Sequence, residues 1–224
     1  MNTTFLMAAR AYSTLKGTLA LVGLAALGVL ALLPAPREAL IDRFPSLARL
    51  SLSADPSPSA TVSGTIQAAE SAREQRLVTD FIAKRYHVSD QAVTGFVTTA
   101  YAAGAQHSVD PLLILAVISV ESRYNPVAES SLGAKGLMQI IPKYHLEKLS
   151  DHGGEQALLD PQVNILVGTR ILREYQRRLG DTEAALQMYG GAFDEPTSQY
   201  ADKVLAEKGR LEVLRQKAKK PESA

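Results

Sequence analysis

An unbroken apolar run that leads to a single acid constrains this chain most strongly. Leu112–Ile118 contains no polar side chain, and Glu121 follows it within one helical turn. Asp110-Pro111 predicts a helix start, because Asp offers an N-cap oxygen and Pro loses no hydrogen bond at the first helical position. Asn125-Pro126 predicts the end, since the residue before a proline is pushed out of the α region. We therefore expect a buried helix over residues 111–124, with Glu121 in its last turn.

The position of Glu121 favours a neutral carboxyl group. Loss of water and the negative end of the helix dipole both disfavour its charge, so both raise its pKa. A raised pKa suits a general acid that works near neutral pH. The alternative is an ordinary solvated glutamate, because Glu is seldom buried without a partner.

The loop after this helix favours the catalytic interpretation. Ser130-Ser131, Gly133 and Gly136 form a segment that can approach a ligand closely. Gly136–Gln139, with the sequence GLMQ, then places an amide beside apolar side chains. Small residues, hydroxyls and an amide suit a sugar polymer that carries N-acetyl groups.

These residues resemble the signature of lytic transglycosylases with the soluble-transglycosylase (SLT, family 1) catalytic domain. The residues that carry the resemblance are Glu121-Ser122, Asn125-Pro126, Ser130, Gly133-Ala134 and Gly136-Leu137-Met138-Gln139. Weaker matches extend it to about Val204, so it covers roughly half of the chain. The resemblance implies a goose-type lysozyme-like fold.

The chemistry that the resemblance implies needs one carboxylate. Glycosidases normally use two, whereas the signature holds only Glu121. In the family, a single Glu protonates the glycosidic oxygen and then deprotonates the 6-hydroxyl of N-acetylmuramic acid, which attacks C1. The resemblance therefore implies a peptidoglycan lytic transglycosylase that cleaves the β-1,4 bond between N-acetylmuramic acid and N-acetylglucosamine. The product carries a 1,6-anhydromuramoyl end.

The resemblance also assigns residues to glycan binding. These are Ser122, Ser130, Gly136, Leu137, Met138, Gln139, Tyr189 and Tyr200. Tyr189 matches the tyrosine of the family's Ala-Tyr-Asn-x-Gly motif, and Tyr200 matches a late tyrosine near the catalytic acid. Core packing is the alternative for each tyrosine. Asn164 and Gly168 resemble a second motif, and we expect structural support from them: Asn164 would orient the loop, and Gly168 would permit close helix packing.

The chain departs from the family at Gly190, where the family usually has Asn, and at Ala192, where its Gly falls. Tyr189-Gly190-Gly191 ends a predicted short helix, and a glycine just past a helix end often has positive φ. Asn is the other residue that best tolerates that conformation. We therefore expect Gly190→Asn to fold and to keep activity, and we expect Gly190→Val to lose stability.

Helical periodicity continues over most of the remaining sequence. Helices are predicted from Ile66, from Ser89-Asp90 to a stop at Gly104, and over residues 142–149, 161–179, 182–189 and 197–217. No alternating apolar run of convincing length predicts a strand. We predict an all-α, orthogonally packed, lysozyme-like catalytic domain around a cleft over residues 66–218, with a tail over 219–224.

The N-terminal segment predicts a membrane anchor. Residues 1–16 carry Arg10 and Lys16 and no acid, and residues 17–33 are uncharged. As a helix, residues 17–33 would span about 26 Å, against a hydrocarbon core of about 30 Å. We predict a cytoplasmic N-terminus (1–16), a single-pass inner-membrane helix (17–33), a Ser/Pro/Ala linker (34–65) and a periplasmic catalytic domain. A cleaved signal peptide and a buried soluble helix are the alternatives.

Composition excludes several other classes. The chain has no cysteine, which excludes disulfides and thiolate chemistry, and a net charge of +1 gives no electrostatic case for nucleic acid. The four histidines lack metal-ligand spacing, so we expect neither a metal nor another cofactor. The expected partners are peptidoglycan glycan strands and the inner membrane through residues 17–33; a cell-envelope assembly stays open.

Two further functions stay open beside the anchored transglycosylase. One is a lysozyme-type muramidase with the same fold, which would release reducing rather than anhydro ends. The other is a catalytically weak peptidoglycan-binding assembly module, which the glycine at position 190 would favour.

Overall fold

The computed structural model describes residues 58–220, and these form helices joined by loops. The helices are α4 (Pro58–Tyr86), α5 (Asp90–His107), α6 (Pro111–Glu121), α7 (Leu146–Leu149), α8 (Pro161–Leu179), α9 (Thr182–Tyr189) and α10 (Gln199–Lys219). Short 3-10 turns are η1 (Pro142–Tyr144), η2 (Ser150–His152) and η3 (Glu155–Leu159). Over this range the chain has isolated β-bridges but no strand, so the predicted all-α class is confirmed there.

The predicted membrane segment cannot be seen in this structure. Residues 1–16, residues 17–33 and most of the linker lie outside the described residues. Within residues 58–220, none of the helices combines the length and the apolar character that crossing a membrane requires. The helix α4 begins at Pro58, inside the stretch predicted as linker, rather than at Ile66.

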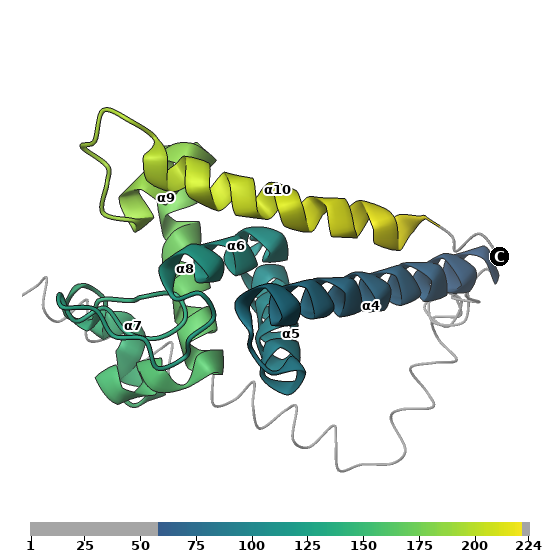
Figure 1. Cartoon of the computed structure of the whole chain (residues 1–224), viewed down its shortest axis with the longest axis horizontal. Helices are drawn as coiled ribbons and strands as arrows, with labels where there is room; N and C mark the ends of the chain where they lie inside the picture. The colour runs from purple at the N-terminus through teal and green to yellow at the C-terminus, as the bar shows by residue number, and fades with distance from the viewer. Residues whose placement is uncertain (1–57, 221–224) are drawn as a thin grey trace, which may run out of the picture. The chain divides into compact units, whose positions relative to one another are not determined.

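Helix α6 is the buried centre of the domain and lies between α5 and α10 (Figure 1). Its residues from Leu112 to Ser119 are all buried. The predicted N-cap is present, because the Asp110 carboxylate accepts a hydrogen bond from the Leu112 N–H at 3.0 Å. Burying each leucine or isoleucine side chain contributes roughly 1.5–3 kcal/mol, so the apolar run fixes α6 in the core.

The end of α6 differs from the prediction. The helix stops at Glu121, with Ser122 as its C-cap, and does not continue to Tyr124. Arg123 and Tyr124 have φ of 53° and 65°, a left-handed conformation that cannot continue a right-handed helix. The buried Tyr124 hydroxyl donates to the Leu115 carbonyl at 2.9 Å and so holds this turn against the helix.

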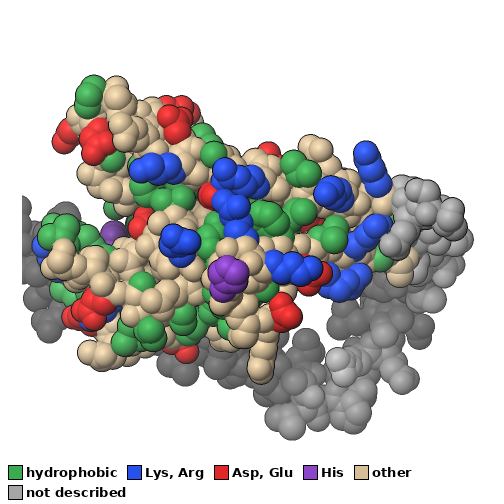
Figure 2. All heavy atoms as spheres, viewed as in Figure 1, with side chains coloured by type: hydrophobic (Ala, Val, Ile, Leu, Met, Phe, Trp, Pro, Cys, Tyr) green, Lys and Arg blue, Asp and Glu red, His purple; other side chains and the backbone are tan. Residues whose placement is uncertain are grey.

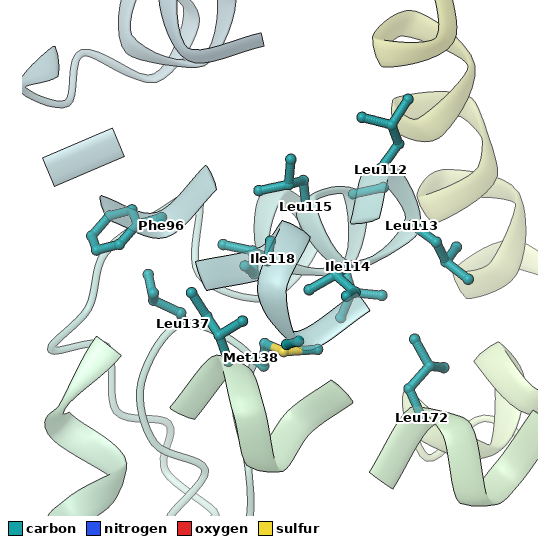
Figure 3. Close-up of a cluster of buried hydrophobic side chains, with 14 of the residues drawn as sticks. Phe96, Leu112, Leu113, Ile114, Leu115, Ile118, Leu137, Met138 and Leu172 are labelled. Carbon is teal, nitrogen blue, oxygen red and sulfur yellow. The ribbon is translucent and has the colours of Figure 1, made fainter. Parts of the chain in front are cut away.

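The core around α6 draws on three other parts of the chain. Figure 3 shows side chains of α6 gathered with Phe96 of α5, Leu172 of α8 and the loop residues Leu137 and Met138. In Figure 1, α8 runs across α6 rather than along it. The loop that carries the GLMQ sequence is therefore part of the core and is not a free surface loop.

Two other predicted boundaries also move. Helix α5 does not stop at Gly104 but runs to His107. A Cβ at Gly104 would lie 2.6 Å from the Val109 carbonyl oxygen, so the lack of a side chain there lets the segment after α5 pack closely against the helix. The predicted helix over 142–149 is interrupted at His145, which separates η1 from α7. The predicted starts of α5, α8 and α9 are confirmed, and Ser89, Asp160 and Asp181 are the N-caps of these helices.

Helix α10 is tied to α6 and α4 by an ion-pair cluster. The Arg215 guanidinium lies 2.8 Å from both the Asp110 and the Glu74 carboxylates, and the Tyr101 hydroxyl donates to Glu74 at 2.6 Å. Figure 2 shows several Lys and Arg side chains over α4 and α10 on this face. Because Asp110 also caps α6, the C-terminal half of α10 is fixed at the start of α6.

Candidate active site

A cleft of about 480 Å³ opens beside the C-terminal end of α6. Its walls come from the end of α6, the loop over residues 130–141, η1, α8 and the end of α9. Within the part of the chain that the structure describes, Glu121 is the one carboxylate that lines it, and no Lys or Arg does. The cleft therefore combines a single carboxyl group with walls that, among the described residues, contain no Lys or Arg.

Glu121 lies in the last turn of α6, as predicted, and is half-buried. Burial raises its pKa to about 7, although a hydrogen bond from the Tyr200 hydroxyl opposes this shift. That hydroxyl donates to Glu121 Oε1 at 2.5 Å. A carboxyl group with this pKa is protonated in a large fraction of molecules at neutral pH, so it can give a proton and take one back.

Tyr200 and Tyr189 have different partners near the acid. Tyr200, in the first turn of α10, donates to Glu121, whereas the Tyr189 hydroxyl donates to the Met138 carbonyl at 2.8 Å. The Tyr189 ring packs edge-on against Tyr175, with centroids 6.4 Å apart. Burial, followed by the charge of Glu121, raises the pKa of both Tyr189 and Tyr200. Both hydroxyls therefore stay protonated and act as donors.

Asn164 holds the GLMQ loop from α8. Its fully buried side chain accepts from the Met138 N–H at 2.8 Å. Its amide nitrogen donates to the carbonyls of Lys135 at 2.9 Å and Leu158 at 2.8 Å. A Cβ at Gly136, which has φ of 74°, would lie 2.2 Å from the Asn164 amide nitrogen. Gly136 has no side chain, and this leaves the space that the Asn164 amide occupies. We call the three hydrogen bonds from Asn164 to these backbone groups the Asn164 clamp.

Gly168 lies beside the same loop. A Cβ there would lie 2.5 Å from the Met138 sulfur and 2.9 Å from the Met138 Cβ. The missing side chain on α8 gives Met138 its space in the core.

Two residues predicted to bind the glycan are core residues instead. Leu137 and Met138 are both 0% exposed, and neither lines the cleft. The hydrogen bonds of the Asn164 clamp turn this part of the loop inward, so its apolar side chains join the core, while the Met138 carbonyl accepts from the Tyr189 hydroxyl. Ser122 and Gly136 also lie outside the cleft lining; the Ser122 hydroxyl donates to the Ile118 carbonyl at 3.2 Å.

Ser130, Gln139 and Tyr189 do line the cleft. The Ser130 hydroxyl oxygen accepts from the N–H groups of Leu132 at 3.3 Å and Ala134 at 3.0 Å, so it also shapes the loop. The Gln139 amide nitrogen donates to the carbonyls of Ala128 and Gly136. This fixes the side chain of Gln139, whose φ is 47°.

The predicted conformation of Gly190 is wrong. Its φ is −74°, and the glycine with positive φ is the next one, Gly191, at 70°. A Cβ at Gly190 would lie 2.5 Å from Cγ of Tyr200. The predicted tolerance of Gly190→Asn is therefore corrected: the backbone accepts asparagine, but its side chain would collide with the Tyr200 ring.

Sequence reasoning missed several residues of the cleft. Tyr144 of η1 and His145 directly after η1 line it, and Leu132 lines it from the loop. Tyr144 and Leu132 are 64% and 78% exposed, and exposed apolar side chains beside a cleft are typical of binding surfaces. Burial, followed by the charge of Lys148, lowers the pKa of His145, so its imidazole is neutral at pH 7. The available signal was the aromatic and polar pair Tyr144-His145, which begins two positions after Pro142.

Comparison with known families decides the assignment of this region. Residues 91–201 match the transglycosylase SLT domain family, and the match includes Glu121 and ends just after Tyr200. Residues 91–201 are an SLT domain.

Several curated proteins are similar to part of this chain. A transglycosylase of Enterobacteria phage PRD1 is 37% identical over 112 residues, which cover 48% of this chain and 40% of the phage protein. The soluble lytic murein transglycosylase of Salmonella typhimurium is 38% identical over 72 residues, which cover 30% of this chain and 11% of that protein. The membrane-bound lytic murein transglycosylase E of Buchnera aphidicola is 37% identical over 79 residues, which cover 33% and 36%. The chain thus spans less than half the length of each of these relatives.

A solved structure also resembles the chain. It is the crystal structure of an inactive mutant of the lytic transglycosylase Slt from Pseudomonas aeruginosa. The similarity covers 56% of this chain and 24% of that chain, with 21% sequence identity and a TM-score of 0.47.

Proposed function

We propose that the SLT domain is a peptidoglycan lytic transglycosylase. It cleaves the β-1,4 bond between N-acetylmuramic acid and N-acetylglucosamine and leaves a 1,6-anhydromuramoyl end. The observation that carries this proposal is a cleft in which Glu121 is the one carboxylate among the described lining residues and has a pKa of about 7. Relatives named lytic murein transglycosylases support it.

In the proposed reaction Glu121 acts twice. Its protonated carboxyl gives the proton to the glycosidic oxygen, and the bond from that oxygen to C1 breaks. The resulting carboxylate then takes the proton of the muramic acid 6-hydroxyl while that oxygen bonds to C1. Glu121 ends protonated again, and no water is consumed. The Tyr200 hydroxyl donates to the carboxylate and stabilises it between the two steps.

The absence of a second lining carboxylate argues against a hydrolase. Inverting enzymes place a second carboxylate roughly 6.5–9.5 Å from the acid, and retaining enzymes place it roughly 5–5.5 Å away. The described residues supply no such group to the cleft. An internal hydroxyl as the nucleophile accounts for a site with one carboxylate.

The experiment is mass spectrometry of purified sacculi digested with the full chain. We expect muropeptides with 1,6-anhydro ends from the wild type and none from Glu121→Gln. The rate should fall by at least the 10²–10⁴-fold that a lost general acid typically costs. Glu195→Gln, a change of an exposed glutamate in the loop after α9, is the matched control and should keep full activity. Reducing ends from the wild type would instead identify a muramidase.

We also propose that residues 17–33 anchor the protein in the inner membrane with the SLT domain in the periplasm. The uncharged run and the basic residues before it support this topology. A full-length protein in the membrane fraction, with a reporter after Ala224 that is active only outside the cytoplasm, is the expected result. Soluble protein whose sequence begins near residue 36 would show a cleaved signal peptide.

A further inference from the structure

Gly190 ends α9 in a conformation that does not require glycine. Its φ of −74° and ψ of 0° are open to L-residues in general, and only proline is excluded, because the Gly190 N–H donates to the Leu186 carbonyl at 2.9 Å. Gly191, the next residue, has φ of 70° and therefore does use glycine's freedom. The reason for a glycine at position 190 must lie in its surroundings.

Those surroundings are the ring of Tyr200. A Cβ at Gly190 would lie 2.5 Å from Cγ, 2.6 Å from Cδ2 and 2.8 Å from Cδ1 of this ring. Real Cβ atoms essentially never come so close to another heavy atom. These atoms form the root of the ring, next to the α10 backbone, so the ring cannot move away as the tip of a flexible side chain could.

The backbone around Gly190 and Tyr200 is clamped by Gln187. The buried Gln187 side chain donates to the carbonyls of Ala192 at 3.1 Å and Thr197 at 3.0 Å. It also accepts from the Ala201 N–H at 2.9 Å. Because the end of α9 and the start of α10 are joined in this way, they cannot separate to admit a side chain. A methyl group at position 190 must displace the ring instead.

We propose that Gly190 is a positioning residue: the missing side chain seats the Tyr200 ring where its hydroxyl donates to Glu121. The hydrogen bond favours the charged carboxylate, so displacing the ring raises the pKa of Glu121 above its value of about 7. The geometry of this proposal does not depend on the reaction. Its consequence for catalysis rests on the proposed function.

Few other described groups near Glu121 could change its pKa in the way that loss of the Tyr200 hydroxyl would. The Tyr200 hydroxyl of α10 contacts Glu121, and further residues with hydroxyl groups line the cleft, including Tyr189 of α9, Tyr175 of α8 and Ser130 of the loop. Tyr144 of η1 and the neutral His145 directly after it also line the cleft. No Lys, Arg or second acid lines it in residues 58–220. Tyr200 is the one described side chain that hydrogen-bonds to Glu121.

The test is Gly190→Ala in the full chain, with two readouts. The first is the titration of the Glu121 carboxyl carbon by ¹³C NMR, with the signal assigned through Glu121→Gln. We expect its midpoint to rise. The second is the pH dependence of anhydromuropeptide release. We expect its basic limb to move to higher pH and the turnover at neutral pH to fall on the order of 10-fold to 100-fold, as misplaced catalytic groups do.

Two controls isolate the Tyr200 hydroxyl. Gly191→Ala puts a methyl group into open space at a strained φ, so it should lower stability and leave the Glu121 midpoint unchanged. Tyr200→Phe should raise the midpoint by itself, and adding Gly190→Ala to it should raise the midpoint no further. An unchanged or lowered midpoint in Gly190→Ala, or an equal rise in Gly191→Ala, would overturn the proposal.

A second variant covers the case in which Gly190→Ala does not fold. Gly190→Ala with Tyr200→Ala removes the ring that the methyl group would meet, so this double variant should fold. If it also fails to fold, the collision lies elsewhere and the proposal is wrong. A wild type that releases no anhydromuropeptides would refute the proposed function, while the NMR titration would still test the role of Gly190.

Discussion

Asn164 binds the backbone of Met138 across 26 residues of sequence, with its Oδ1 accepting the Met138 N–H at 2.8 Å. The carbonyl of Met138 in turn accepts from Tyr189, which lines the cleft. Asn164 of α8 thus fixes the Met138 backbone, and the Met138 carbonyl in turn holds Tyr189 in the wall of the cleft. The link explains why the polar side chain of Asn164 is buried in α8.

Asn164→Ala should destabilise the domain strongly. It leaves the Met138 N–H and the carbonyls of Lys135 and Leu158 buried without this partner. Each orphaned group costs roughly 1–3 kcal/mol, so we expect a loss of about 3 kcal/mol or more in the free energy of unfolding. Urea denaturation measures it. Gln162→Ala, at an exposed position in the first turn of α8, should stay within about 0.5 kcal/mol of wild type.

Gly168→Ala should destabilise, against the usual trend for a glycine in a helix. The new methyl group would meet the Met138 side chain at 2.5–3.0 Å, and overpacking of this kind typically costs about 1–3 kcal/mol. Gly95→Ala in α5 is the matched control. Its Cβ would meet nothing within 4 Å, so the better helix propensity of alanine should stabilise the domain by about 0.5–1 kcal/mol. Thermal melts that shift equally for both variants would contradict this difference.

Glu121→Gln should stabilise the folded domain at alkaline pH. The folded pKa of Glu121 is about 7, raised from an ordinary value of 4.5. The stability that this group contributes is therefore fully present below pH 4.5 and is lost as pH rises through 7. Glutamine has no such loss, so its advantage should grow to roughly 2–3 kcal/mol above neutral pH. Urea denaturation at several pH values checks this, and a constant difference between the two proteins would contradict it.

Tyr189→Phe should weaken the fold without changing the titration of Glu121. The variant removes the hydrogen bond to the Met138 carbonyl, at a cost of about 1–2 kcal/mol in unfolding free energy. Glu121 keeps its bond from Tyr200, so its midpoint should stay near that of the wild type. Tyr175→Phe serves as the control, because its ring also packs in this wall but makes no hydrogen bond through its hydroxyl in the described structure. It should be nearly neutral.

Local signals predicted most of the helices. Asp110, Asp160 and Asp181 cap their helices through hydrogen bonds to N–H groups two or three residues ahead, so a short sequence window contains all that is needed. The end of α6 could not be predicted in this way. There, the left-handed turn at Arg123 and Tyr124 is held by a hydrogen bond back to Leu115, and its energy comes from burial in the complete fold.

The candidate site could be predicted less completely than the helices, because it depends more on contacts between residues far apart in the sequence. The raised pKa of Glu121 followed from its place at the end of a buried helix, which the sequence displays. Its bond to Tyr200 joins residues 79 positions apart, and only the family resemblance indicated it. The family resemblance assigns Met138 to glycan binding, yet the hydrogen bond from its N–H to Asn164 helps to hold this part of the loop in the core. The space at Gly190 depends on α10, which no local rule includes.

The ion pair between Arg215 and Asp110 bears on where this domain can be cut. The family match ends at residue 201, one position after Tyr200, but the helix that carries Tyr200 runs on to Lys219. A fragment that stops at the match boundary would leave this tyrosine on a single unsupported turn, where helix ends fray. A fragment that reaches Lys219 keeps the far end of the helix fastened by Arg215. A shortened protein that retains Glu121 and every lining residue of the cleft could therefore still lose the hydroxyl that contacts the acid.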